Sequence, residues 1–151
     1  MGGENTYASG PGPVDPPSDI AAVISARGLV GLASDAKWDH FVDTIRMREG
    51  WRPDYRYKCV DGPASEWDNE WFYHLPFPLV SVEWMDLAFW ERRHEPRGRH
   101  VVITDQSPWL EAALRAAGLD HSKGAGMIRI FGYSPRRGDF FDDLGAGAAC
   151  P

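Results

Sequence analysis

The amino-acid sequence predicts an α+β fold: an antiparallel sheet of about five strands with two or three helices packed on one face. Two observations lead to this prediction. Segments with apolar residues three and four positions apart, which is the helical period, occur both before and after the middle of the chain. Between them, residues 55–90 contain short segments of alternating apolar and polar residues divided by turn residues, which is typical of hairpin-connected strands.

Three segments have the periodicity and the boundary residues of helices. A short helix is predicted after Ser18, which would cap it; Ile20, Val23 and Ile24 fall on one face, and Gly28 would end it. A clearer helix begins near Asp35 and carries an apolar stripe at positions i, i+3, i+4 and i+7. The stripe consists of Trp38, Phe41, Val42 and Ile45. A third helix is expected to begin with Ser107 as its cap and Pro at its first position, and to end at Gly118.

The strand predictions rest on the two-residue period. Residues 55–60 mostly alternate between apolar and polar side chains and predict a half-buried strand. Asp68 and Asn69 are turn-forming residues between two aromatic segments, so residues 65–73 predict a tight hairpin. Further strands are predicted in residues 80–90, 100–104 and 127–133.

The domain organisation follows from composition. Residues 1–17 are rich in Gly, Pro and Ser and predict a disordered N-terminal arm. Residues 18–134 are expected to form a single α+β domain, because a chain of 151 residues is the size of one domain. Residues 135–151 are polar and Gly-rich and predict a flexible C-terminal tail.

Charge and cysteine content restrict the classes of partner and compartment. The net charge of −6 argues against a nucleic-acid partner, because such proteins gain affinity mainly by neutralising phosphates. No segment approaches the length of apolar sequence that spans a membrane, and the N-terminus does not read as a secretion signal. Two cysteines are too few for a disulfide framework. We therefore expect a cytoplasmic protein without a membrane or nucleic-acid partner.

The highest density of functional side chains lies in residues 65–74. An enzyme or ligand-binding site there would use Glu66 and Glu70 as an acid/base pair, or Asp68, Glu70 and His74 as metal ligands. On an extended strand, however, His74 would lie about 13 Å from Glu70. The histidines and cysteines also lack the spacing of a metal site. The sequence therefore assigns no catalytic residue, no metal ligand and no cofactor, and the enzyme remains the alternative.

The favoured interpretation is a non-enzymatic surface that contacts another protein. Trp is enriched at the centres of interfaces, and carboxylates steer basic partners. The predicted contact residues are Glu66, Trp67, Asp68, Glu70, Trp71 and His74. A second charged feature, the basic cluster in residues 92–99, is interpreted as a solvated turn rather than a nucleic-acid site, because no aromatic ladder accompanies it.

The same residues carry a resemblance to a known family. The motif Ser65-Glu66-Trp67-Asp68-x-Glu70-Trp71-Phe72-Tyr73-His74 is accompanied by Lys37-Trp38, Trp51-Arg52, Val82-Glu83-Trp84 and Ile130-Phe131-Gly132-Tyr133. Over residues 35–133 this pattern resembles a family of small bacterial proteins of unknown function, which implies no particular activity. By size and charge alone the chain is also similar to immunity proteins, which block a toxin by covering its site. The expected partner is therefore a protein such as a basic toxin domain.

Overall fold

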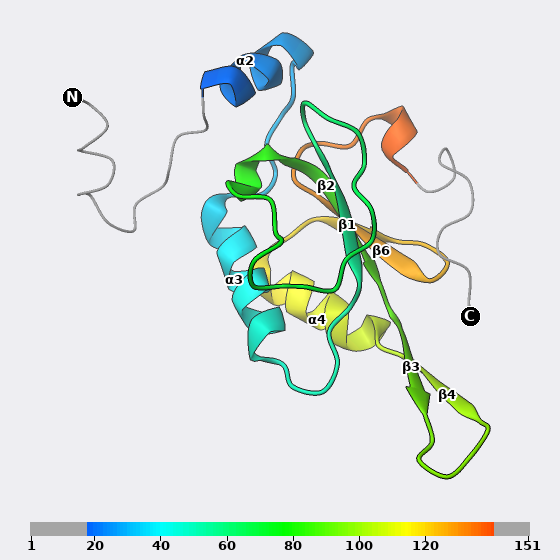
Figure 1. The fold of residues 1–151 in the computed structure, drawn as a ribbon. Coiled ribbons are helices and arrows are strands. Elements are labelled where there is room, and N and C mark those ends of the chain that lie inside the picture. Colours follow the sequence, from blue (N-terminus) through cyan, green and yellow to red (C-terminus); the bar gives the residue numbers. More distant parts are fainter. Residues whose placement is uncertain (1–17, 141–151) are drawn as a thin grey trace.

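The protein has an α+β fold with helices, a four-stranded sheet and a two-stranded sheet (Figure 1). The computed structural model describes residues 18–140. The predicted N-terminal arm and residues 141–151 of the predicted tail lie outside the described residues. The helices are α2 (Ser18–Arg27), α3 (Asp35–Met47) and α4 (Ser107–Ala117), so all three predicted helices are confirmed. Among the described residues, no helix is long and apolar enough to cross a membrane.

The main sheet is antiparallel throughout and has the strand order β1-β2-β6-β5. Its strands are β1 (Tyr55–Cys59), β2 (Val82–Ala88), β5 (His121–Lys123) and β6 (Met127–Phe131). The remaining strands, β3 (Trp90–His94) and β4 (Val101–Asp105), pair only with each other. The prediction of a single sheet of about five strands is therefore wrong in detail, although the fold class is confirmed.

The separation of the two sheets occurs at Phe89, which is buried between β2 and β3. Its N–H donates to the carbonyl of Gly126 beside the main sheet, and its carbonyl accepts from Gln106 beside β4. The chain thus changes pairing partners within one residue. The sequence is apolar without interruption from Leu87 to Trp90 and carries no turn residue, so the predicted strand 80–90 continued across the break.

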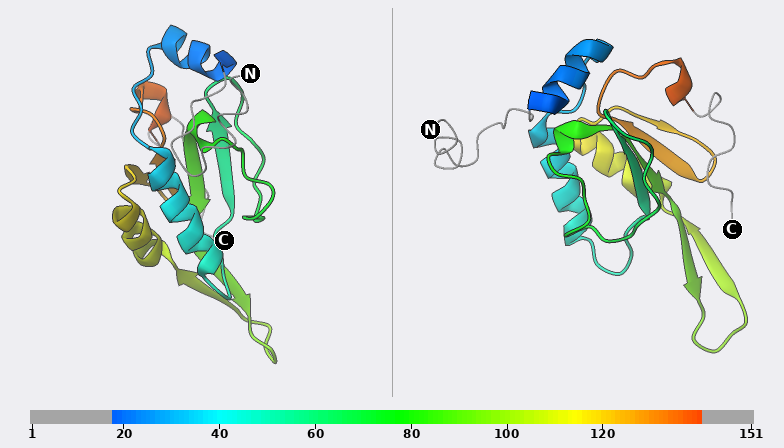
Figure 2. Two further views of the ribbon diagram at one scale, coloured as in Figure 1. Left: turned by 90° about the vertical axis from the view of Figure 1, so that its left-hand side faces the viewer. Right: turned by 45° about the horizontal axis from the view of Figure 1, so that its top comes forward.

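Helices α3 and α4 lie side by side on one face of the main sheet (Figure 2). The predicted apolar stripe of α3 is buried. The sheet residues that face these helices share one side of the pleat. They include Tyr55, Met85, Leu87, Ile128 and Ile130, each fully buried. This single core holds both helices against the sheet, as expected when each element buries one apolar face.

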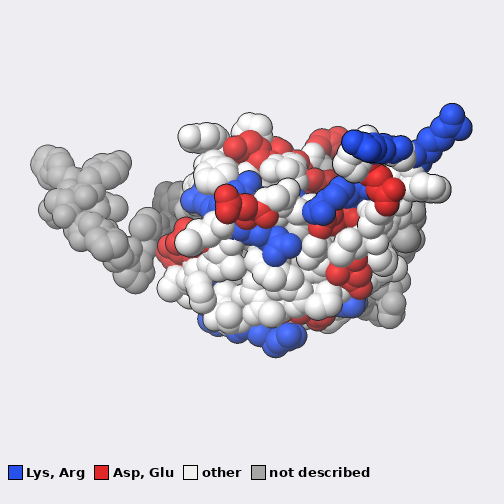
Figure 3. Space-filling view, turned by 90° about the horizontal axis from the view of Figure 1, so that it is seen from below, with Lys and Arg blue, Asp and Glu red and all other residues white. Residues whose placement is uncertain are grey.

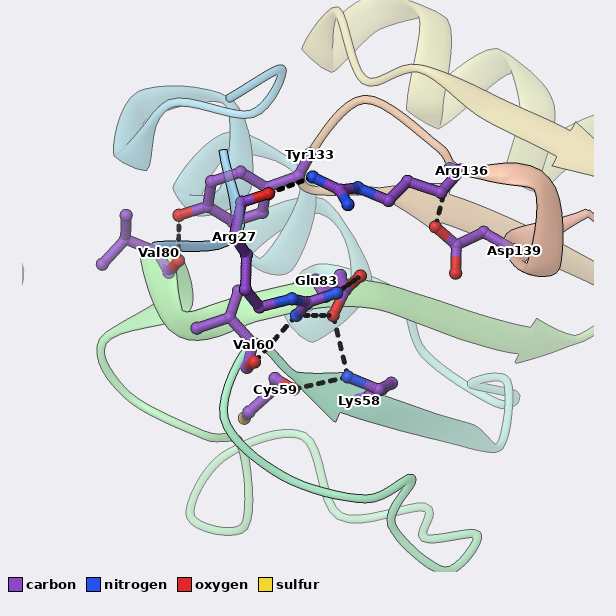
Figure 4. A network of polar contacts seen from close by, with 9 residues as sticks. All are labelled: Arg27, Lys58, Cys59, Val60, Val80, Glu83, Tyr133, Arg136 and Asp139. Carbon is purple, nitrogen blue, oxygen red and sulfur yellow. Dashed lines mark hydrogen bonds and ion pairs between the residues drawn. The ribbon is translucent and has the colours of Figure 1, made fainter. Parts of the chain in front are cut away.

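Helix α2 is attached separately, through a small apolar cluster and an ion-pair network (Figure 4). Arg27 donates to both carboxylate oxygens of Glu83, at 2.7 and 2.9 Å, and to the carbonyl of Val60 at 2.8 Å. Lys58 contacts the same carboxylate at 2.8 Å. Burial raises the pKa of Glu83, but the hydrogen bonds and charges of Arg27 and Lys58 lower it more, so the net direction is down. The network therefore holds an ionised glutamate between the helix and the sheet.

The face of the main sheet opposite α3 and α4 carries a buried ion cluster. Asp86 is fully buried and accepts from Arg129 at 2.7 and 2.8 Å and from Arg56 at 2.9 Å. The Arg129 guanidinium also lies 3.6 Å from the centre of the Trp84 ring. The described part of the predicted tail packs here, since the carbonyl of Asp139 accepts from Arg129. Both faces of the sheet are therefore covered, one by apolar contacts and one by charge pairs.

Gly132 explains one of the motifs noted in the sequence. A Cβ at this position would lie 2.1 Å from the carbonyl oxygen of Val82, which is far inside any real contact. The Gly132 N–H donates to the carbonyl of Glu83, and its own carbonyl accepts from Leu32 and Ala33. Only a residue without a side chain fits where these three segments meet.

Candidate functional site

The predicted hairpin at residues 65–73 is wrong, because these residues form no strand. Between β1 and β2 the chain makes a long connection, residues 61–78, which we call the aromatic loop. Two isolated bridges attach it to the outer edge of β1, joining Tyr55 to Asp68 and Lys58 to Ala64. Tyr55 and Asp68 exchange backbone hydrogen bonds of 2.8 Å in both directions. The loop therefore covers an edge that would otherwise be open, in place of forming its own hairpin.

Trp71 fixes the loop to the core. Its side chain is fully buried, and its ring lies 4.7 Å from Tyr55 and 6.3 Å from Phe41, measured between ring centres. The indole N–H donates to the carbonyl of Pro53 at 2.9 Å, and the Trp71 carbonyl accepts from Arg46 of α3 at 2.8 Å. Trp71 is thus a core residue, and its prediction as a contact residue is corrected. Its burial also explains the failed hairpin, because it draws the chain out of the sheet and beneath α3.

Asp68 uses both carboxylate oxygens within the loop. One accepts from the backbone N–H groups of Asn69 and Glu70, at 2.7 and 3.0 Å. The other lies 2.8 Å from Nδ1 of His74. These hydrogen bonds, first the one from the Glu70 backbone and then the one with His74, lower the pKa of Asp68. The residue acts as the centre of a turn.

Glu70 organises the next turn in the same way. Its Oε1 accepts from the backbone N–H groups of three consecutive residues, Phe72, Tyr73 and His74. The bond from Tyr73 is the largest cause of a lowered Glu70 pKa, and the other two add to it. A carboxylate that accepts several backbone N–H groups is stabilised in its ionised form. Glu70 therefore stays ionised and shapes the loop, with one of its oxygens occupied by three backbone N–H groups.

His74 also lies elsewhere than expected. The sequence placed it about 13 Å from Glu70, on the assumption of an extended strand. In the structure its backbone N–H reaches Glu70 at 3.3 Å, and its ring contacts Asp68. The turn made by Glu70 causes this approach. Asp68, Glu70 and His74 are therefore brought together, whereas Glu66 is exposed and apart from their hydrogen bonds.

The residues that the loop exposes are mainly aromatic. The exposed large side chains are Trp67 (38%), Phe72 (45%), Tyr73 (87%) and Phe77 (58%). The guanidinium groups of Arg46 and Arg52 lie 5.4 and 5.3 Å from the centre of the Phe72 ring, and that of Arg56 lies 4.8 Å from Trp67. Sequence reasoning identified Trp67 but missed the other three. The available signal was the run Trp71-Phe72-Tyr73. Three consecutive aromatic side chains in one turn cannot all point into the core, so at least one ring must be exposed.

A hollow of about 430 Å³ adjoins the loop and tests the enzyme alternative. It is lined by Arg52, Asp68, Asn69, Glu70, Trp71 and Phe72. The proposed acid/base partner Glu66 and the ring of His74 do not line it. No three His, Cys, Asp or Glu side chains within residues 18–140 are arranged to hold a metal ion. The geometry thus gathers one Asp–His pair, of which Asp68 lines the hollow and His74 does not.

Comparison with known proteins adds one finding. The sequence profile of a family of unknown function, DUF6678, matches residues 20–137. The chain belongs to this family. The match covers every described strand and, apart from the first two residues of α2, every described α-helix, so the aromatic loop lies inside the family domain. Membership of an uncharacterised family is therefore confirmed. No curated protein and no solved structure matches the chain.

The role of Glu70 predicts a pH-dependent loop. The pKa values of Glu70 and Asp68 are lower in the folded loop than in the unfolded chain, where a carboxyl group has a pKa of about 4. The two carboxylates therefore order the loop fully above the unfolded pKa, and this effect is lost as the pH falls through their pKa values in the folded loop. We expect protection of the Phe72 and Tyr73 amides, measured by hydrogen exchange and corrected for intrinsic rates, to decrease at acid pH. At neutral pH, Glu70→Gln should lower the same protection several-fold.

The matched control is Glu66→Gln, which removes an exposed carboxylate of the same loop without a hydrogen bond to these amides. It should leave their exchange unchanged. Equal exchange in the Glu70→Gln variant and the parent protein would show that the carboxylate does not order the loop.

Proposed function

We propose that this protein acts by binding another protein through the aromatic loop. The observation that carries the proposal is the group of exposed aromatic side chains, above all Tyr73 at 87% and Phe77 at 58% exposure. Rings of this size are seldom left in water without a use, and Tyr and Trp are enriched where interfaces bind most strongly. No catalytic residue enters this proposal.

The internal hydrogen bonds of the loop support this role. Asp68 and Glu70 accept from backbone N–H groups, so the loop is ordered before any partner arrives. A preformed surface loses less conformational entropy on binding than a mobile one. The buried Trp71 adds a rigid anchor beneath the exposed rings. The carboxylates thus support binding by shaping the loop rather than mainly by steering the partner.

A more specific form of the proposal is that the protein is a cytoplasmic immunity protein that covers the site of a cognate toxin. The net charge of −6 supports a basic partner, because opposite charges speed association. Exposed Glu66 and Trp67 would lie at the rim of such an interface. The chain's small size supports an inhibitor that acts by occlusion.

The enzyme alternative has one observation in its favour. The Asp68 carboxylate lies 2.8 Å from the His74 ring, as in a pair where a carboxylate orients a general base. Glu70, its expected companion, is engaged by three backbone N–H groups. A pH-dependent hydrolytic activity that disappears in His74→Gln would favour the enzyme over the binding protein.

The binding proposal is tested with the product of the gene adjacent to this one as the candidate partner. The wild-type protein is expected to bind it, and the double variant Tyr73→Ala, Phe77→Ala should bind about tenfold more weakly or worse, because two interface anchors are lost. Isothermal titration calorimetry gives the affinity. If the partner is a toxin, co-expression of the wild-type chain, but not of the variant, should restore growth.

The control is Val30→Ala, which truncates an apolar side chain that is 63% exposed and outside the loop. Both variants should keep the parent melting temperature, since all three side chains are exposed. Unchanged affinity in the Tyr73→Ala, Phe77→Ala variant would remove the aromatic loop from the interface.

A further inference from the structure

The two-stranded sheet forms an arm that projects from the body of the protein (Figures 1 and 2). We use the name arm for residues 90–105, which comprise β3, β4 and their connecting turn. The sequence interpretation treated its basic residues as a solvated turn. In the structure they belong to an ordered antiparallel pair in register from Trp90↔Asp105 to His94↔Val101.

The hydrogen-bond pattern of the arm identifies which backbone groups are open. Gln106 donates to the carbonyl of Phe89 at one end of the pair, and Glu95 donates to the carbonyl of His100 at the other. Antiparallel pairs alternate between bonded and non-bonded positions, so Ile103 and Val101 occupy non-bonded positions. Their N–H and C=O groups point away from β3, and no described residue bonds to them. The outer edge of β4 is therefore open for pairing.

The side chains of β4 are more exposed than expected for its composition. Val102 is 43% exposed and Ile103 is 38% exposed, and as neighbours on a strand they lie on opposite faces of the arm. A two-stranded sheet with apolar side chains in water on both faces is only marginally stable by itself. An added strand would satisfy the open backbone groups and cover these side chains.

The charge of the arm indicates which kind of partner strand would bind to it. The exposed basic residues are Arg92, Arg93, His94, Arg97, Arg99 and His100. Arg93 is paired with Glu91 at 2.6 Å. The other acidic residues of the arm are Glu95 in the turn and Asp105 at the base, whose carboxylate accepts from the Ser107 N–H. Figure 3, seen from below, shows Lys and Arg side chains reaching outward at one corner of the molecule. Because the arms of two copies would repel each other, the charge disfavours self-pairing and favours an acidic strand.

We propose that the outer edge of β4 binds an extended acidic segment of a partner protein by strand addition. Val101 and Ile103 supply the backbone hydrogen bonds, and the arginines of the arm contact the acidic side chains. A polypeptide fits better than a nucleic acid, because only a polypeptide backbone can pair with the open N–H and C=O groups of β4 by strand addition. This surface is separate from the aromatic loop.

The test uses a short fluorescent peptide of alternating glutamate and valine, and fluorescence anisotropy with the full chain. The peptide should bind, and its affinity should fall with added salt. Ile103→Pro removes one outward N–H without breaking a bond to β3, and it should weaken binding about tenfold. Ile103→Thr keeps the N–H and should retain most of the affinity. Arg92→Glu with Arg97→Glu should weaken binding by a similar factor.

Two further probes separate the alternatives. A peptide of the same sequence with methylated backbone nitrogens on the pairing edge keeps the charge but cannot form the strand, and it should not bind. If the methylated peptide binds as tightly as the unmodified one, simple charge attraction replaces strand addition. If oligothymidylate binds more tightly than the acidic peptide, a nucleic acid replaces the acidic segment. Absence of binding by the unmodified peptide at low salt would overturn strand addition as well. Tyr73→Ala, Phe77→Ala should leave peptide binding unchanged, so failure here is distinct from failure of the aromatic loop.

Discussion

Replacing Asp86 by alanine is expected to lower the free energy of unfolding by about 3–5 kcal/mol, because the change removes the acid from a buried ion cluster. Arg129 is 1% exposed and donates from both Nε and Nη2 to this carboxylate. Without Asp86, this buried guanidinium loses two hydrogen bonds and the negative charge of its ion-pair partner. Since domains of this size are stable by only about 5–15 kcal/mol, the loss should be plain in the urea midpoint.

The control for Asp86 is an aspartate in the opposite situation. Asp39 is exposed on α3, and its pKa is raised by partial desolvation and by the nearby charges of Asp35 and Asp43. Its ionised form is therefore disfavoured in the folded protein, so Asp39→Ala should change stability by about 0.5 kcal/mol or less. A loss from Asp86→Ala no larger than that of Asp39→Ala would contradict the importance of the cluster.

A second comparison separates charge from packing. Replacing a buried ion pair by apolar residues of similar volume is often neutral, whereas removing one partner is costly. Asp86→Leu combined with Arg129→Met should therefore be more stable than Asp86→Ala alone. An equal loss of unfolding free energy in both variants would show that the loss comes from altered packing and not from an uncompensated charge.

The elements that were predicted correctly are those whose signals lie within a few neighbouring residues of the sequence. The stripe of α3 buries Trp38, Phe41 and Ile45 as expected, and the end of α4 at Gly118 has the left-handed backbone, with φ of +73°, that glycine favours. These signals are local and need no knowledge of the rest of the chain. β5, by contrast, was missed, because its residues His121–Lys123 are polar and too few to show alternation.

The errors at the site arose where distant contacts override local preference. Asp68 was correctly identified as a turn residue, and its carboxylate does accept from the next two backbone N–H groups. The turn nevertheless belongs to a loop and not to a hairpin, because the backbone of Asp68 pairs with Tyr55. No sequence pattern between Tyr55 and Asp68 predicts that their backbones pair. The composition of residues 65–74 thus indicated a candidate site, but not which side chains this loop exposes.

Trp71→Ala is the second change with a large expected effect, a loss of about 3–5 kcal/mol in unfolding free energy. The side chain is fully buried against Phe41 and Tyr55, so its removal leaves a cavity between α3 and β1. Trp71→Phe keeps much of the packing but leaves the buried carbonyl of Pro53 without its indole donor. It should lose about 1–3 kcal/mol. Chemical denaturation followed by circular dichroism measures both.

Trp67→Ala is the matched control, because Trp67 is in the same loop but 38% exposed. It should cost little stability, about 1 kcal/mol or less, mainly from its contact with Arg56. Equal losses for Trp67→Ala and Trp71→Ala would contradict the division of the loop into an anchor and an exposed surface.

The same substitution links stability to the proposed function. Trp71 holds the segment that carries Tyr73, and its carbonyl is the acceptor for Arg46 of α3. Trp71→Ala should therefore increase hydrogen exchange in residues 72–74 and weaken partner binding, even at temperatures where the domain stays folded. Loss of stability with unchanged loop exchange and unchanged affinity would separate the two roles. Because a core tryptophan and two internally bonded carboxylates position the exposed rings, the proposed binding surface depends on residues that lie beneath or behind those rings.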